Sequence, residues 1–386
     1  MGIKQLKIDA NELTIGMYVS GLDRPWSQTP FPLQGFYIKD PSEIRELKAR
    51  CHHVYIDIVK GSPPLEQQAR PVAIRKNQPR QKNVYKGIRQ PNASSLAGVK
   101  PIRVDASVYS TTVVPIAKEI DKARNLHREV YGAVQNVMEQ LGSDGSVPVK
   151  ETTKVASSMV DSVLRSPDAF TWLTRVKEKD EHTYAHAVRC AVWGILLGRH
   201  IGMPKADLDV LSMGILLKDI GKTRLPQYLL EKKELTSVER DAYEKFVEYG
   251  VDILKRTPDV KPRVMSVVKT HCERIDGSGF PDHLKADRIP FLGKIAGIVT
   301  FYDETTHPRG QMIPLSPSKA VAKLYELRDR DFQSDLVVEF IRAIGLYPTG
   351  TLVKLNTGEV AVVVEQNFKR RLKPKVMIVM LSLIHI

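Results

Sequence analysis

Between Asp168 and Gly345 the apolar residues of this 386-residue chain recur at the spacing of α-helices almost without a break. The interruptions are short and rich in glycine and proline. Thr236 stands three residues before Glu239, which is the capping-box pattern of a helix start. The pattern therefore predicts an all-α domain of six or seven helices over residues 168–345.

The two ends of the chain have strand-like patterns instead. Residues 4–60 predict a small α+β module in the order strand, strand, helix, strand, with Ser42 as the cap of its helix. The strands are expected within 7–19, 35–38 and 53–58. Residues 346–380 predict a short C-terminal β segment. Residues 381–386 match the translation of a common sequencing-adapter end, so we expect them to be a sequence artefact.

The regions between these parts differ in composition. Residues 61–106 are expected to be a basic flexible linker. Residues 70–103 contain nine Lys or Arg and no Asp or Glu, and so contribute nine of the fourteen excess positive charges of the chain. The Pro, Gln, Asn and Ser content of this region favours a solvated linker, and contact with an anionic polymer is the alternative. Residues 107–167 follow as two connecting helices, at 108–141 and 150–164. The fold class is therefore mainly α, with a small N-terminal α+β module and a short C-terminal β segment.

Composition sets limits on the class of protein. A hydrophobic content of 42% is enough for packed cores in a chain of two or three domains. No apolar run is long enough for a transmembrane helix, and the N-terminus has no apolar signal core. Three cysteines far apart fit a reducing compartment. We therefore expect a cytoplasmic protein.

Two segments carry most of the residues whose side chains could bind a metal or take part in a reaction. Residues 218–222 read Lys-Asp-Ile-Gly-Lys, and residues 271–281 read His-Cys-Glu-Arg-Ile-Asp-Gly-Ser-Gly-Phe-Pro. Upstream, His182 and His186 are four residues apart and so share one face of a helix. Imidazoles and carboxylates are ligands for divalent metals, and the glycines of the second segment permit tight turns.

These segments resemble the two signature motifs of the HD-GYP family, whose members are bacterial metal-dependent phosphodiesterases acting on cyclic-di-GMP. The N-terminal region is similar to a domain of unknown function that often precedes HD-GYP domains, including the Leu-Asp-Arg-Pro-Trp run at 22–26. The resemblance implies an all-helical HD-type domain at 168–345. It also implies iron or manganese as the divalent metal, and cyclic-di-GMP or a related nucleotide as the ligand.

Site residues follow from the same resemblance. Asp219 and Lys222 match positions of catalytic importance in the family. The implied metal ligands, which form a weak or partial site, are His182, His186, Asp219, His271 and Cys272. The implied substrate contacts are Lys222, Arg309, Gly279, Phe280 and Pro281.

Five ligand positions depart from the family pattern, and one of them is His182, which stands where an acidic ligand usually lies. Lys218 stands where the family has a His ligand, and a protonated ammonium has donors but no lone pair for a metal. Cys272 replaces the second His of a pair, Phe246 replaces an isolated His, and Thr300 replaces the last Asp ligand. An intact two-metal site is therefore not expected, and the chain is expected to bind little metal or none.

The sequence leaves three classes of function open. The favoured hypothesis is a catalytically impaired HD-GYP protein of cyclic-di-GMP signalling, which acts by binding a nucleotide or by binding signalling proteins through its loop 276–281. The alternative is a weak metal-dependent phosphodiesterase. The third is a binder of anionic polymers through the basic tract 70–103. Whether the chain forms a homodimer is left open.

Overall fold

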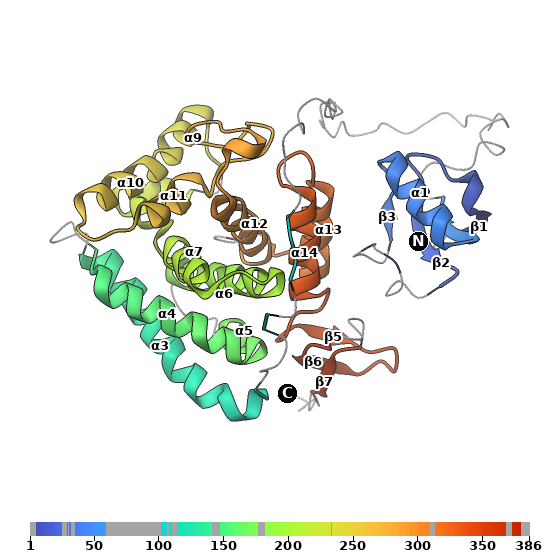
Figure 1. Ribbon diagram of the computed structural model, residues 1–386, viewed down its shortest axis with the longest axis horizontal. Helices are drawn as coiled ribbons and strands as arrows, with labels where there is room; N and C mark the ends of the chain where they lie inside the picture. The colour runs from blue at the N-terminus through green and yellow to red at the C-terminus, as the bar shows by residue number, and fades with distance from the viewer. Residues whose placement is uncertain are drawn as a thin grey trace, which may run out of the picture. The chain divides into compact units, whose positions relative to one another are not determined.

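The chain divides into two compact units, Met1–Gln90 and Pro91–Ile386, each of which is described by itself (Figure 1). The computed structural model describes residues 5–24, 29, 31, 35–58, 102–105, 108–109, 114–140, 147–176, 182–232, 234–308, 313–367 and 373–379. Most of the predicted basic linker and all of residues 381–386 lie outside these ranges.

The described residues of the first unit form a four-stranded antiparallel sheet in the order β1-β4-β2-β3 and one α-helix. Its elements are β1 Gln5–Asp9, the short 3₁₀ helix η1 Ala10–Glu12, β2 Tyr18–Leu22, β3 Phe36–Tyr37, α1 Pro41–Arg50 and β4 His53–Asp57. The buried side chains of Met17, Ile38, Leu47 and Ile56 form its core.

Two details of this unit were predicted wrongly. Three strands precede the helix instead of two, because the Asp9 side chain accepts from Asn11 N and starts η1, which ends β1. The helix is capped by Asp40, whose Oδ1 accepts from Ser42 N at 2.7 Å, while Ser42 itself lies inside the helix. Pro41 follows the cap and has no N–H that needs a partner.

The second unit is mainly helical, as predicted. Its α-helices are α3 Ile116–Gln140, α4 Val149–Arg165, α5 Pro167–Val176, α6 His182–Ile201, α7 Lys205–Leu217, α8 Gln227–Glu231, α9 Ser237–Glu244, α10 Phe246–Arg256, α11 Pro262–Thr270, α12 Phe291–Thr306, α13 Pro317–Glu326 and α14 Ser334–Ile344. The described residues also form two 3₁₀ helices, η4 Ile220–Arg224 and η5 Ala286–Arg288. The described residues after Ser166 thus hold ten α-helices, more than the six or seven predicted, because single residues such as Lys245 separate short helices like α9 and α10.

Helices α6 and α7 lie at the centre of this unit (Figure 1). They pack closely because α6 presents Gly194 and Gly198 to Ile215 and Leu208 of α7, where a Cβ would meet the opposing side chains. α3, α4 and α5 cover the pair on one side, while α11, α12 and α14 also pack against it. This arrangement buries most of α6, including His186 in its second turn.

The tail forms a three-stranded antiparallel sheet in the order β5-β6-β7, as predicted. The strands are β5 Leu352–Lys354, β6 Val360–Glu365 and β7 Lys375–Ile378. Asp168, at the start of α5, is buried and accepts hydrogen bonds from Thr349 Oγ1 at 2.6 Å and Gln366 N at 3.4 Å. This carboxylate therefore ties both ends of the β5–β6 segment to the helical bundle. Among the described residues, no helix has the length and hydropathy needed to cross a membrane.

Candidate functional site

The junction between α7 and η4 brings Lys218 and Asp219 into the protein core. Lys218 is the C-cap of α7 and Asp219 is the N-cap of η4. Two positions later, Gly221 packs so closely on α10 that a Cβ there would overlap the backbone of Phe246 and Gly250. Only glycine allows this approach, which fixes the turn that directs Lys218 and Asp219 inward.

His186 on α6 is held by a buried ion network with α12. Its Nδ1 lies 2.7 Å from Asp303 Oδ2. Arg189, one turn along α6, donates from Nε to Asp303 Oδ1 at 2.8 Å and from a terminal nitrogen to Oδ2 at 3.0 Å. All three side chains are buried. Asp303, which the family pattern does not make a primary ligand, thus orients the imidazole.

Lys218 occupies the other side of the His186 ring. Its Nζ lies 2.9 Å from His186 Nε2 and also contacts Asp219 Oδ2. An ammonium can only donate, so Nε2 must be the accepting nitrogen and Nδ1 must carry the proton that is donated to Asp303. This tautomer is assigned from the hydrogen-bond network. The lone pair that would ligate a metal is therefore used by Lys218.

Burial and charge set the protonation states of this cluster. Burial and the Lys218 ammonium lower the pKa of His186 to about 4, so the ring is neutral at neutral pH. Burial favours a neutral Asp219, but the ammonium groups of Lys218 and Lys222 outweigh it and hold the pKa of Asp219 well below its usual range. Burial by itself would lower the pKa of Lys218, and the Asp219 carboxylate more than reverses this and raises it. Lys218 and Asp219 are thus a charged pair with 0% and 1% of their side chains exposed.

His271 approaches from the end of α11. Its Nδ1 donates to Val268 O at 2.8 Å, which leaves Nε2 as the unprotonated nitrogen. Burial and the positive charge of Lys218 lower its pKa to about 3. The ring of Phe246 stacks edge-on against it at 5.8 Å between centroids, and Lys222 Nζ lies 4.7 Å from the centre of the Phe246 ring. Phe246 therefore presents an apolar ring to His271 at the position where the family pattern has a His.

Cys272 does not join His186. It packs half-buried beside Phe246, Leu225 and Phe280, and burial raises the pKa of its thiol to about 12. The cysteine close to His186 is Cys190, whose Sγ lies 3.6 Å from Nδ1. Sequence reasoning missed both Arg189 and Cys190, although their spacing of three and four from His186 already placed them on the same helix face.

The described residues contain one group with the composition of a metal site. Ligand atoms of His186, Cys190 and Asp303 lie within 4.8 Å of one another. Both oxygens of Asp303 are used by Arg189, and burial raises the pKa of the Cys190 thiol well above its usual value. Within the described part of the chain, the Thr300 hydroxyl, at the position of the last Asp ligand, is buried without a hydrogen-bond partner. As arranged, these residues do not fit a metal pair.

The glycine-rich loop is ordered by Glu273. Its buried carboxylate accepts from Asp282 N at 2.8 Å and from Leu284 N at 2.9 Å. A Cβ at Gly279 would overlap the backbone at Cys272 and Arg274, so this glycine is required by the fold of the loop itself. Phe280 faces Phe246, with ring centroids 6.1 Å apart. The predicted substrate contact Phe280 therefore lies against the same Phe246 ring as Lys222.

Two predicted site residues are not located. Arg309 and the side chain of His182 lie outside the described residues. Pro281 follows Phe280 in the loop and is half-buried.

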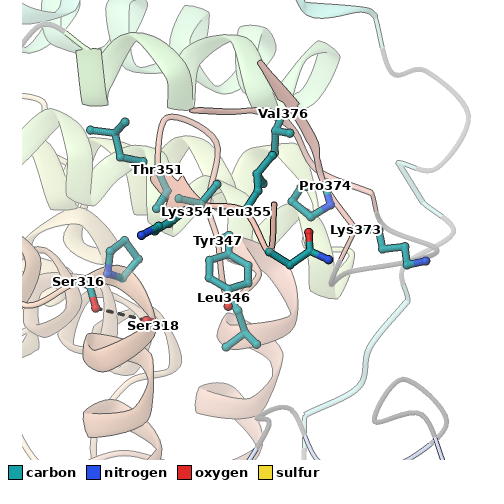
Figure 2. A pocket seen from close by; sticks show the side chains of 14 residues that line it. Ser316, Ser318, Leu346, Tyr347, Thr351, Lys354, Leu355, Lys373, Pro374 and Val376 are labelled. Carbon is teal, nitrogen blue, oxygen red and sulfur yellow. Dashed lines mark hydrogen bonds between the residues drawn. The ribbon is translucent and has the colours of Figure 1, made fainter. Parts of the chain in front are cut away.

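A separate cavity of about 530 Å³ lies beside the C-terminal sheet (Figure 2). It is lined by residues at the start of α13, after α14, and on β5 and β7, including Ser316, Tyr347, Lys354 and Lys373. No acidic residue and none of the predicted site residues is in its lining. The cavity is therefore distinct from the His186 cluster.

Comparison with known proteins agrees with this fold. Residues 174–336 match the HD domain family, and residues 5–152 match a domain of unknown function, DUF3391. The cyclic di-GMP phosphodiesterase PA4108 of Pseudomonas aeruginosa is 28% identical over 373 residues, which cover 96% of this chain and 84% of that protein.

Two further relatives match over shorter lengths. The cyclic di-GMP phosphodiesterase response regulator RpfG of Xanthomonas campestris is 25% identical over 64% of this chain and 66% of its own length. The 3'3'-cGAMP-specific phosphodiesterase 2 of Vibrio cholerae is 33% identical over 42% of this chain and only 31% of its own length.

The helical bundle carries the match to the HD domain family over residues 174–336, which gives the class of protein. With the two signature segments, the N-terminal domain and these relatives, the chain belongs to the HD-GYP family. That family is metal-dependent, which makes the position of Lys218 the central question about this member.

Proposed function

We propose that this protein takes part in cyclic-di-GMP signalling by binding a nucleotide or a partner protein, without hydrolysing the nucleotide. Support for the nucleotide class comes from the relative that matches 96% of this chain and is named as a cyclic di-GMP phosphodiesterase. Support for the loss of hydrolysis comes from the site itself.

One observation carries the proposal: the Lys218 ammonium lies 2.9 Å from His186 Nε2 and also contacts Asp219. Metal-dependent phosphodiester hydrolysis needs cations that polarise the phosphate and generate hydroxide near neutral pH. An ammonium supplies positive charge, but it cannot accept the lone pair of a water oxygen and so lower the pKa of that water as a metal does. The chain therefore keeps the fold of the enzyme and lacks its means of activating water.

The experiment is a hydrolysis assay on the full-length protein supplied with Mn²⁺ or, under anaerobic conditions, with Fe²⁺. The linear product of cyclic-di-GMP is measured by chromatography, with an active HD-GYP enzyme as positive control. We expect no turnover above that of an Asp219→Ala variant. Repeated turnovers that Asp219→Ala removes would establish the alternative function instead.

That alternative is a weak metal-dependent phosphodiesterase. The observation that favours it is the retention of His186, Asp219 and His271, three buried groups whose charges influence one another. In this case, an added metal would have to displace Lys218 from His186. The same assay decides between the two functions.

The mode of binding needs a second measurement. Calorimetric titration of the protein with cyclic-di-GMP, without added metal, tests for a nucleotide receptor. A saturable signal without product supports nucleotide binding, and the absence of a signal leaves protein recognition through the loop 276–281 as the function to pursue.

A further inference from the structure

Asp219 holds two ammonium groups, one on each carboxylate oxygen. Lys218 Nζ contacts Oδ2, and Lys222 Nζ contacts Oδ1. Both lysine side chains are buried, with exposed fractions of 0% for Lys218 and 6% for Lys222. Lys222 matches a lysine of the family motif, so Lys218 is the cation that this chain adds to the Asp219 carboxylate.

Lys218 also connects three parts of the helical bundle. It belongs to the α7–η4 junction and reaches His186 Nε2 on α6 at 2.9 Å. His186 Nδ1 in turn lies 2.7 Å from Asp303 on α12. One ammonium group therefore joins the junction to α6 directly and to α12 through the imidazole.

A metal ion at this position would have to replace Lys218. Ligation by an imidazole requires a distance of about 2.0–2.1 Å and the same lone pair on Nε2 that Lys218 now uses. The ammonium cannot become a ligand while it is protonated, and it repels a nearby cation. Its charge is matched by Asp219, as a buried charge requires.

We propose that Lys218, through its contacts with Asp219 and His186, takes the place of a bound metal as the cross-link of this helical domain, so that the fold of the domain is independent of bound divalent metal. The inference rests on the proposed function only through the shared Lys218 contact, and its test measures stability and metal content instead of hydrolysis.

The test uses the full-length protein and the variants Lys218→Met, Lys218→His and Lys205→Met. Lys205→Met is the matched control, because Lys205 is on the same helix, α7, and makes an ion pair with Asp209 at 3.2 Å while its side chain is 42% exposed. Each protein is stripped with EDTA, and one half is then incubated with Mn²⁺ and desalted. Bound Mn²⁺ is measured by elemental analysis, and Tm is measured by circular dichroism.

The native protein should hold no stoichiometric Mn²⁺ and should have the same Tm with and without it. Lys218→Met should lower Tm by about 10 °C, since breaking a buried pair leaves Asp219 and His186 underpaired. Lys205→Met should change Tm by only about 2–4 °C, the effect of an exposed pair. Lys218→His should be less stable when stripped, and should bind Mn²⁺ and regain part of the lost Tm.

The native protein decides the proposal even if Lys218→Met does not fold. About one Mn²⁺ per native chain, together with a fall in Tm on stripping, would overturn it. So would equal effects of Lys218→Met and Lys205→Met on Tm. If the native protein hydrolyses cyclic-di-GMP and its Tm is the same with and without metal, only the proposed function is refuted. If its Tm depends on metal and no hydrolysis is seen, only the cross-link is refuted.

Discussion

Asp303 is a fully buried carboxylate whose charge depends on Arg189 and His186 from α6 and on His307. Arg189 binds both of its oxygens, at 2.8 and 3.0 Å, and His186 lies 2.7 Å away. Arg189 and His186 together hold the pKa of Asp303 well below its usual range against the opposing effect of burial. Because a buried charge without a partner is costly, Arg189 is a structural requirement of the His186 site.

Arg189→Gln should therefore lower the free energy of unfolding by about 3–5 kcal/mol, the cost of breaking a buried ion pair from one side. The matched change Arg124→Gln should cost less than about 1 kcal/mol, because Arg124 makes an exposed pair with Asp121. Urea unfolding followed by circular dichroism measures both. Equal effects of the two changes would contradict the role given to Arg189.

Asp23 makes the stability of the first unit depend on pH. Its Oδ2 accepts from His52 N at 2.7 Å and from His53 N at 3.3 Å, which joins the end of β2 to the start of β4. Burial opposes the charged form, but these backbone donors lower the pKa of Asp23 from 3.8 to about 2. The unfolded chain therefore binds a proton more readily than the folded chain between these values.

It follows that the stabilisation from Asp23 is fully present above about pH 4 and is lost as the pH falls through about 2. Asp23→Asn should be less stable than the native protein at pH 7, and the difference should shrink steadily between pH 4 and pH 2. Hydrogen exchange of β4 at several urea concentrations reports the stability of this unit. A difference that stays constant over this range would show that the charge of Asp23 is not the cause.

At the scale of elements, the approach of η4 to α10 decides where the Lys218–Asp219 pair lies. A side chain at Gly221 would overlap backbone atoms of Phe246 and Gly250, which cannot move as a flexible side chain can. Gly132 on α3 offers the opposite environment, because a Cβ there meets nothing within 4 Å.

Gly221→Ala should therefore destabilise the helical unit by about 1–3 kcal/mol or more, as overpacking does. Gly132→Ala should stabilise it by up to about 1 kcal/mol through helix propensity. Thermal or urea unfolding of the two variants shows directly whether each change raises or lowers the stability. A neutral Gly221→Ala would mean that η4 and α10 separate easily.

Elements with strong local signals were predictable from the sequence. The capping box at Thr236 is present, with Thr236 Oγ1 accepting from Glu239 N and the Glu239 side chain accepting from Thr236 N. The helix predicted at 150–164 is α4, Val149–Arg165. Such features depend on residues close in sequence, so a single chain is enough to reveal them.

The contacts of the candidate site were not predictable in the same way. The sequence showed that Lys218 cannot ligate a metal, but it did not show that Lys218 donates to His186, 32 positions earlier. That contact depends on the packing of α6 against α7, and the pairing of Arg189 with Asp303, 114 positions apart, depends on the packing of α6 against α12. Side chains that meet only through tertiary packing leave no periodic signal.

At the scale of the whole molecule, the boundary of the helical unit falls inside a family match. The DUF3391 match covers 5–152 and so spans the first sheet, the basic tract and α3. Residues just before α3 contact the helical bundle: Ile102 N donates to Asp335 at 2.7 Å, and Tyr109 OH donates to Met203 O at 2.7 Å. These contacts predict how far the chain can be shortened.

A chain that begins at Pro91 should keep the thermal transition of the helical unit, because it retains Ile102 and Tyr109. A chain that begins at Val114 should unfold several degrees lower, since it loses these hydrogen bonds and the contact of Arg199 with Tyr109 O. Calorimetry of both truncated proteins compares the transitions. Identical transitions would show that the segment before α3 adds nothing to stability.

A bound metal ion exchanges with the free ion in its surroundings, so its occupancy and any stability it confers vary with concentration. The ammonium of Lys218 is covalently part of the polypeptide and is present once in each folded copy. Iron starvation can empty a metal site, but it cannot remove a side chain. A protein built on this cluster would give the same response in iron-poor and iron-rich surroundings.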